Sequence, residues 1–329
     1  MQKIPGHSLP SFSDEALEDA LFHYTTADGL IGIFQNKELW STAHYCANDE
    51  SELITGKGIL TPLFKEKSYE LEKENDPRVN LFRKRGTSII DFADGFEQQI
   101  IALTFNSLSA YITCFCKPNR EEDFHHGLLS QWRGYGADGG YALQFSRKKL
   151  LNAIAGINES TRLNYELQDV YYSTDNPLKT DVLKKEDAYV NAYLSQLDEI
   201  TKPLSELFNR KTMPNPIVKL IGGPLESLLE YMVKTKNKHF SEENECRLSL
   251  IQLSQPCSEC LPVSYFNHKG LLVPYTKTPQ ELNILDCVDW IVIGPGPRLE
   301  ARMKSVTQLI RQSGRKIAVR PSHIPFTRL

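Results

Sequence analysis

The stretch FHYTTADGLIGIFQNKELW, residues 22–40, joins a short apolar and aromatic segment directly to a helical pattern. Residues 21–25 are typical of a buried strand. Apolar side chains then recur at helical spacing, at Leu30, Ile33 and Phe34. Thr26 or Asp28 is the expected N-cap of that helix. The sequence therefore predicts a strand that runs straight into a helix over 26–36.

Strand alternation divides the side chains of 21–25 between two faces. Phe22 and Tyr24 lie on one face, and the other face carries Leu21, His23 and Thr25. Because this second face is polar where a first strand usually buries Val or Ile, we expect another polar segment to lie against it. A single histidine on a strand is more often structural than catalytic, so a role for His23 depends on that partner.

Composition limits the class of protein. The 329 residues are 40% apolar and 24% charged, which is typical of a globular protein that buries its own core. A net charge of -3 gives no general basic field for nucleic acid, although the basic stretch 65–85 keeps nucleic acid open as a substrate.

Cysteine usage and hydropathy indicate the compartment. The seven cysteines are scattered and no signal-peptide pattern opens the chain, so we expect a reducing cytoplasm and no disulfide framework. Apolar runs are far shorter than the roughly 20 residues that span a bilayer, so no membrane partner is expected.

The strand patterns form two groups separated by helices. Strands are predicted at 109–116, 141–146, 245–253, 261–266, 270–275, 288–293 and 316–320, and helices at 87–103, 128–133 and 299–313. Residues 61–86 are interpreted as a charged, solvated helical excursion, and 176–238 as an inserted helical layer. This order predicts one α+β domain over 1–329. Its two antiparallel sheets, around 21–25 with 141–146 and around 245–253 with 288–293, are expected to enclose a cleft.

The stretch HFSEENECRLSLIQL, residues 239–253, combines a loop rich in carboxylates with a strand. Alternation sends Cys246, Leu248 and Leu250 to the core and places Glu245, Arg247 and Ser249 on the opposite face. Glu243 joins this polar face if the strand begins early. Two such carboxylates can divide the work of stabilising positive charge and orienting an acceptor. The structural alternative is a solvent-exposed ion pair between Glu245 and Arg247.

Two other groups of residues have possible chemical roles. Gln131, Trp132 and Tyr135 offer stacking and hydrogen-bonding surfaces for a flat heterocycle, or they anchor a loop to the core. Two cysteine pairs, Cys257 with Cys260 and Cys114 with Cys116, have the residue type for zinc, but their spacing makes a structural zinc site improbable. We therefore expect no metal.

Several stretches together resemble the bacterial domain-of-unknown-function family 2971. They are FHYTTADGLIGIFQNKELWST, NDESE, LLSQWRGYGADGGYALQFS, EENECRL, VIGP and RPSHIPF, in this order. The most specific is the Ser-Gln-Trp-Arg-Gly-Tyr-Gly run, and Cys246 stands where members usually carry Trp. That family is in turn similar to a distant branch of the ADP-ribosyltransferase superfamily.

This second resemblance implies a split-sheet nucleotide cleft and NAD as substrate. It places His23 on the ribose and carboxamide of NAD, and Glu245 with Glu243 as the catalytic acids. Tyr135 or Tyr141 is the candidate for stacking on nicotinamide, and Tyr24, Thr25, Gln131 and Trp132 are expected to line the NAD site.

The implied activity is ADP-ribosyl transfer to a macromolecule, protein or nucleic acid, by a toxin or phage-defence effector. NAD glycohydrolase activity is the alternative with the same chemistry. A non-catalytic module that binds a nucleotide or a protein is the rival from another class.

Overall fold

The computed structural model describes residues 12–46, 58–135, 139–173, 186–201, 223–255 and 257–325. Its strands are β1 (Ala20–Thr25), β2 (Trp40–Ala43), β3 (Leu108–Cys116), β4 (Tyr141–Ser146), β5 (Tyr165–Asp169), β6 (Tyr171–Ser173), β7 (Thr235–Asn237), β8 (Glu245–Leu253), β9 (Ser264–His268), β10 (Leu271–Lys277), β11 (Val288–Ile293) and β12 (Ala318–Pro321). Its helices are α1 (Asp14–Asp19), α2 (Ala27–Asn36), α4 (Thr61–Lys73), α5 (Pro77–Lys84), α6 (Ile89–Ser107), α7 (Glu121–His126), α8 (Leu129–Tyr135), α9 (Arg147–Ser160), α11 (Glu186–Thr201), α13 (Gly223–Lys234) and α14 (Leu299–Ser313).

The expected strand and helix at the start of the chain are confirmed. β1 runs directly into α2, and the Thr26 side chain accepts a hydrogen bond from the Gly29 amide, so Thr26 is the N-cap. Strands β2, β5 and β6 were not predicted. β7 was also not predicted, and it lies inside the stretch 176–238 that was expected to be helical. A strand of three residues is too short to show a strand pattern in the sequence.

The α+β class is confirmed, but the strands are grouped differently from the expectation. Ten of the described strands form one mixed, largely antiparallel sheet in the order β12-β11-β4-β1-β3-β2-β10-β9, with β8 paired to β3 and β5 to β8. β11 pairs with β4, so 288–293 belongs beside 141–146 and not beside 245–253. Sequence periodicity indicates where strands lie, but it does not determine which strands pair with one another.

β1 and β3 are neighbours in the sheet but pair over a short stretch. Their pairing is confined to Phe22 and Cys116, whereas β3 pairs with β8 along its whole length, ending at Cys116 and Glu245. Residues in register on neighbouring strands point to the same face. Phe22, Cys116 and Glu245 therefore share one face of the sheet, and the strands that carry His23 and Glu245 are separated only by β3.

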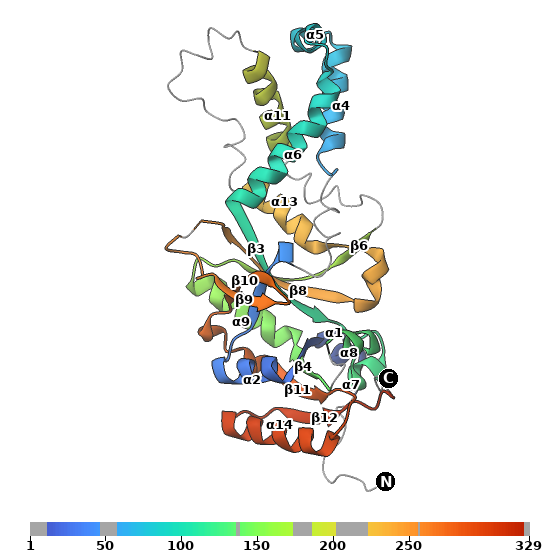
Figure 1. Ribbon diagram of the computed structural model, residues 1–329, viewed down its shortest axis with the longest axis vertical. Coiled ribbons are helices and arrows are strands. Elements are labelled where there is room, and N and C mark those ends of the chain that lie inside the picture. Colours follow the sequence, from blue (N-terminus) through green and yellow to red (C-terminus); the bar gives the residue numbers. More distant parts are fainter. Residues whose placement is uncertain are drawn as a thin grey trace.

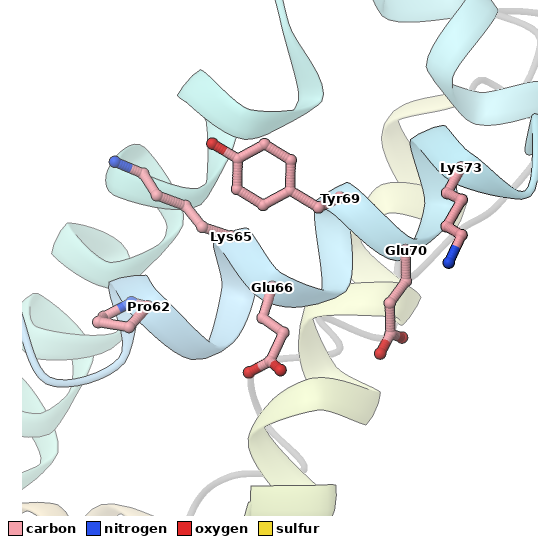
Figure 2. Close-up of a pocket in the computed structure, with 6 residues that line it drawn as sticks. All are labelled: Pro62, Lys65, Glu66, Tyr69, Glu70 and Lys73. Carbon is pink, nitrogen blue, oxygen red and sulfur yellow. The ribbon is translucent and has the colours of Figure 1, made fainter.

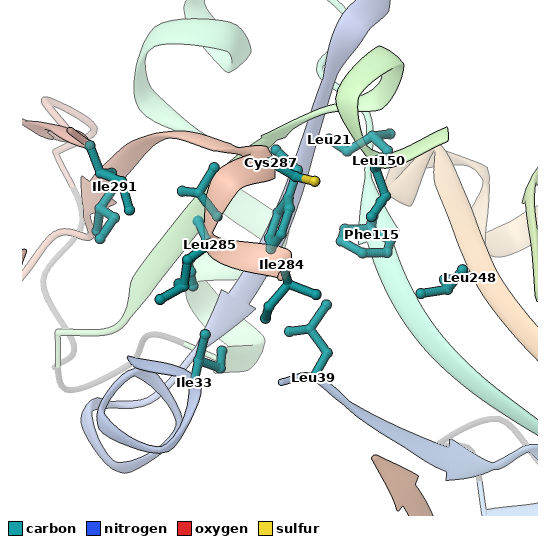
Figure 3. Packing of buried hydrophobic residues seen from close by; sticks show 14 of the residues in the cluster. Leu21, Ile33, Leu39, Phe115, Leu150, Leu248, Ile284, Leu285, Cys287 and Ile291 are labelled. Carbon is teal, nitrogen blue, oxygen red and sulfur yellow. The ribbon is translucent and has the colours of Figure 1, made fainter. Parts of the chain in front are cut away.

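Two hydrophobic clusters cover opposite faces of the sheet around β1. The larger packs α2, α9 and α14 against Leu21, Phe115, Leu143 and Leu248 (Figure 3). The smaller one packs α7 and α8 against Phe22, Tyr24 and Cys116. The alternation predicted for 21–25 is confirmed by this division.

The helices of the excursion and of the insertion form one arm beyond the sheet (Figure 1). In this arm α4, α5, α6, α11 and α13 share a hydrophobic cluster with the start of β3. Phe64 and Phe82, from the segment expected to be solvated, are buried there against Tyr193 and its neighbours. Charged residues occupy the outer face of α4, and its apolar residues occupy the inner face.

Candidate functional site

Glu245 begins β8 and is held by two buried cations. Its Oε1 accepts a hydrogen bond from Arg247 Nε at 2.8 Å, and its Oε2 accepts from Arg247 Nη2 and from Lys236 Nζ, both at 3.1 Å. Glu245 is 2% exposed and Arg247 3%. The ion pair between Glu245 and Arg247, which the sequence left open as a solvent-exposed alternative, is inside the protein, because α13 covers this face and Arg247 Nη1 donates to the carbonyl oxygen of Val233.

Glu243 contacts Lys236, one of these two cations, from the solvent-exposed side. Lys236 Nζ lies 2.9 Å from Glu243 Oε2, and the Glu243 side chain is 26% exposed. A short 3-10 helix, Lys238–Glu243, leads from β7 to this point, and Asn244 makes the turn into β8 with a positive φ of 41°. This turn places one carboxylate at the surface and the next, two residues later, in the interior.

The charges around Glu245 determine its ionisation. Burial alone raises the pKa of this carboxyl group, but the nearby Arg247 and Lys236 outweigh burial and hold the pKa below the ordinary 4.5. The Glu245 amide also donates to the Tyr172 hydroxyl at 2.7 Å. Glu245 is thus a fixed, ionised group with little freedom to meet a substrate.

Tyr135 and Cys114 complete a polar surface next to Glu243, and we call Glu243, Lys236, Tyr135 and Cys114 the Glu243 niche. The Tyr135 side chain is about half exposed, and Cys114 is exposed on β3 opposite Arg247. Partial burial raises the pKa of Tyr135 to about 12, and Cys114 and Glu243 add to this effect. The niche combines an aromatic ring, a carboxylate, an ammonium group and a thiol.

Two other predicted residues, Tyr24 and Trp132, anchor α8, on which Tyr135 lies. The Tyr24 hydroxyl accepts a hydrogen bond from the Leu128 amide at 2.7 Å, and its ring lies edge-on to Trp132 at 4.8 Å. Trp132 is fully buried and donates from Nε1 to the His126 carbonyl at 2.8 Å, and Gln131 is 7% exposed. This is the loop-anchoring arrangement that the sequence left open as an alternative to stacking.

His23, Thr25 and Tyr141 lie on the opposite face of the sheet. His23 Nδ1 contacts the Cys114 carbonyl oxygen at 3.1 Å, and its ring lies 5.8 Å from that of Phe115. Burial lowers the pKa of His23. Thr25 is in register with Tyr141, whose ring lies 5.0 Å from the guanidinium carbon of Arg302. The structure therefore does not bring these three side chains into the Glu243 niche.

Lys236 and Tyr172 take part in the site and were not among the predicted residues. Lys236 comes from a stretch interpreted as helical, and Tyr172 from a strand too short to recognise. Local sequence holds no signal for either residue, because both reach Glu245 through the pairing of β6 with β7.

The described surface also has pockets away from the Glu243 niche. One of about 480 Å³ lies along the outer face of α4 and is lined by Pro62, Lys65, Glu66, Tyr69, Glu70 and Lys73 (Figure 2). Lys65 is 3.1 Å from Asp94 and Lys67 is 2.7 Å from Glu70. Two of its charged lining residues, Lys65 and Glu70, are thus paired with other residues of the arm.

The cysteines do not assemble a metal site in the part of the chain that is described. No group of three or more His, Cys, Asp and Glu side chains there is placed to hold a metal ion. Cys257 and Cys260 form a disulfide, which differs from the expectation of a chain without such bridges. The described helices include none with the length and apolar character needed to cross a membrane.

Comparison with known families adds one match. A family model described as a protein of unknown function, DUF2971, matches residues 131–248, from α8 to β8. This supports the resemblance to that family over the part of the chain that carries Tyr135, Glu243 and Glu245. Neither the curated proteins nor the solved structures give a match.

Proposed function

We propose that the protein is an NAD-consuming ADP-ribosyltransferase whose reaction takes place at the Glu243 niche. The observation that carries the proposal is the ammonium group of Lys236, which lies between Glu243 at 2.9 Å and Glu245 at 3.1 Å. This contact orients a partly exposed carboxylate next to the exposed ring of Tyr135. In this assignment Glu243 is the catalytic residue, and Glu245 is a positioning residue that acts through Lys236.

The reaction needs a negatively charged group close to the ribose carbon that carries the nicotinamide. When the bond between nicotinamide and ribose breaks, nicotinamide leaves with the bonding electron pair and positive charge develops on the ribose carbon. A carboxylate that binds the neighbouring hydroxyl stabilises this charge more than it stabilises the ground state. A nucleophilic atom of the acceptor then bonds to the ribose carbon and loses its proton. The exposed Tyr135 ring supplies a stacking surface for the nicotinamide.

A second function is favoured by the burial of Glu245. Both oxygens of this carboxylate accept hydrogen bonds from Arg247 and Lys236. The same contacts are expected if the three residues form an ion-pair network with a purely structural role. With such a network the protein is a module that binds a nucleotide or a protein without turnover.

One experiment separates these functions. The full chain is incubated with NAD labelled on the adenylate part, with and without cell lysate. Label on macromolecules is the expected result and identifies the acceptor class. Free ADP-ribose without labelled macromolecules identifies a glycohydrolase. Unchanged NAD in both reactions overturns the proposed transferase and supports the binding module.

A further inference from the structure

Arg320, on the edge strand β12, is a buried charge without a counter-ion. It is 2% exposed. Arg320, Val292, Ala142 and Tyr24 are in register across β12, β11, β4 and β1, so they share the face covered by α7 and α8. Among the described residues, no carboxylate lies within salt-bridge distance of this guanidinium.

The guanidinium is only partly satisfied by its neighbours. Nη2 donates to the carbonyl oxygen of Phe124 and to Gln144 Oε1. The guanidinium carbon lies 4.9 Å from the ring of Trp290 and 5.4 Å from that of Phe124. Nε and Nη1 are buried and have no hydrogen-bond partner in the described part of the chain. Three N–H groups are thus left without an acceptor.

A buried guanidinium without a counter-ion and with unmade hydrogen bonds lowers the stability of the folded protein. A buried charge normally has a partner, and an unmade hydrogen bond to a charged group costs more than one to a neutral group. Burial lowers the pKa of Arg320 to about 10, and no opposing charge offsets this effect. The group stays protonated at neutral pH, so the missing partner is an acceptor that carries negative charge.

The surroundings of Arg320 hold a second buried nitrogen without a partner in the described part of the chain, and a pocket lies next to the residues that contact Arg320. His125 is 8% exposed, and its Nδ1 is a second buried nitrogen without a partner among the residues described. His125 follows Phe124, whose carbonyl oxygen accepts a hydrogen bond from Arg320 Nη2. Burial lowers the pKa of both His125 and His126, and the charge of Arg320 adds to this effect. A pocket of about 350 Å³ is lined by Phe124, Gln144 and Trp290, the three residues that contact Arg320, and by Lys316, while Arg320 itself lies behind this lining.

The acidic residues at the same pocket already have partners. Asp289 pairs with Lys149 at 2.5 Å, and Asp19 accepts a hydrogen bond from the Lys148 amide at 2.7 Å. They are therefore not the counter-ions of Arg320.

We propose that Arg320 anchors an oxyanion-binding site, which takes a phosphate or carboxylate group of a small ligand through the Phe124, Gln144 and Trp290 pocket. The unpartnered Nη1–H groups donate to the oxyanion, and the rings of Trp290 and Phe124 hold the guanidinium in place. In the sheet, β11, β4 and β1 lie between β12, which carries Arg320, and β3, which carries Cys114 of the Glu243 niche. The proposal does not depend on the proposed transferase activity.

Thermal unfolding of the full chain in inorganic phosphate tests the site. At pH 7.5 and constant ionic strength, replacing chloride by phosphate is expected to raise Tm by several degrees and to saturate, because a ligand that binds the native state stabilises it. A parallel titration with acetate distinguishes the two oxyanions, since the better ligand produces the larger shift at equal concentration. A Tm that does not respond saturably to phosphate or to acetate overturns the proposal.

Variants assign the effect to Arg320. Arg320→Leu removes the uncompensated charge, so it is expected to abolish the saturable shift while leaving the anion-free Tm equal to or above that of the wild type. Arg162→Gln is the matched control, because Arg162 is an exposed arginine paired with Glu259, and it should keep the full shift. A full shift in Arg320→Leu overturns the proposal.

A conservative variant covers the case in which Arg320→Leu does not fold. Arg320→Lys keeps the charge but loses the planar set of donors. Isothermal titration is expected to show phosphate binding weakened about tenfold or more in this variant. Unchanged phosphate affinity in Arg320→Lys also overturns the proposal.

Discussion

Lys236 Nζ lies 3.1 Å from Glu245 Oε2, and both side chains are at least nine-tenths buried. The same nitrogen is 2.9 Å from Glu243. Lys236 is therefore shared between an interior carboxylate and one at the surface. This sharing gives two neighbouring glutamates different physical roles, and it leads to the first two predictions.

Glu245→Gln is expected to destabilise the fold strongly. The change leaves Arg247 and Lys236 buried without their main counter-charge, and breaking a buried pair on one side costs about 3–5 kcal/mol. Urea unfolding monitored by circular dichroism measures the free energy of unfolding. Glu243→Gln is the control, and because its carboxylate is partly exposed its cost should stay under about 1 kcal/mol. Equal losses in the two variants would contradict the buried network.

Acid should weaken the same pair. Because the pKa of Glu245 is lower in the folded chain than the ordinary 4.5, its contribution is complete above that pH and is lost as the pH falls through the folded-state pKa. The difference in unfolding free energy between wild type and Glu245→Gln is therefore expected to shrink as the pH is lowered below about 4.5. A difference that stays constant down to pH 3 would argue against an ionised Glu245.

Glu243→Gln is expected to remove NAD consumption while the fold is kept. Losing one preorganised electrostatic contact lowers kcat by about 10²–10³-fold. Release of nicotinamide from NAD measures the rate. Glu242→Gln, at the neighbouring exposed carboxylate, should remain fully active. If folded Glu243→Gln were as active as the wild type, the assignment of Glu243 as the catalytic residue would be wrong.

His44 is expected to make the protein sensitive to mild acid. Burial lowers the pKa of His44 to about 4 from an ordinary 6.5, and Arg247 contributes to the same direction. The unfolded chain thus binds more protons between these pH values, so stability is complete above pH 6.5 and falls as the pH decreases toward 4. The loss amounts to about 3 kcal/mol.

The variant His44→Asn tests this pH dependence. Its amide keeps a donor for the Ala110 carbonyl, which His44 Nδ1 contacts at 3.2 Å, but it does not titrate. We expect a flatter curve of unfolding free energy between pH 6.5 and 4.5 than in the wild type. His268→Asn, at an exposed position on β9, is the control and should leave the curve unchanged. An identical slope in His44→Asn and wild type would remove His44 as the cause.

Gly294→Ala is expected to disturb the anchor of α8. A Cβ at this position would lie 2.7 Å from the Trp132 ring and 2.9 Å from the Gly140 carbonyl oxygen. Overpacking of this kind costs about 1–3 kcal/mol. Thermal unfolding is the measurement, and Gly95→Ala is the control.

Gly95 lies in α6 and has no heavy atom within 4 Å of an added Cβ. Its replacement should therefore stabilise the helix by about 0.5–1 kcal/mol. Opposite signs of the Tm change in the two variants are expected, and a Gly294→Ala protein as stable as the wild type would show that Trp132 has room to move.

The sequence alone determined most of the strands and the faces of the residues on them. The alternation at 21–25 correctly separated Phe22 and Tyr24 from Leu21 and His23, and that at 245–250 correctly sent Cys246 and Leu248 to the core. Helix α14, at 299–313, was predicted from local patterns, and so was an N-cap at Thr26 or Asp28, of which the structure shows Thr26. These features depend on residues near one another in the chain, and their periodicity is therefore visible in the sequence.

Only the tertiary structure decided which of these elements meet. Strand pairing is set by contacts between distant residues, so β11 joined β4, and β3 came between the strands of His23 and Glu245. Because in-register neighbours share a face, the odd and even positions of β1 and β8 then placed His23 and Glu245 on opposite sides of the sheet. The burial of Glu245 likewise required Lys236, which local sequence does not connect to it.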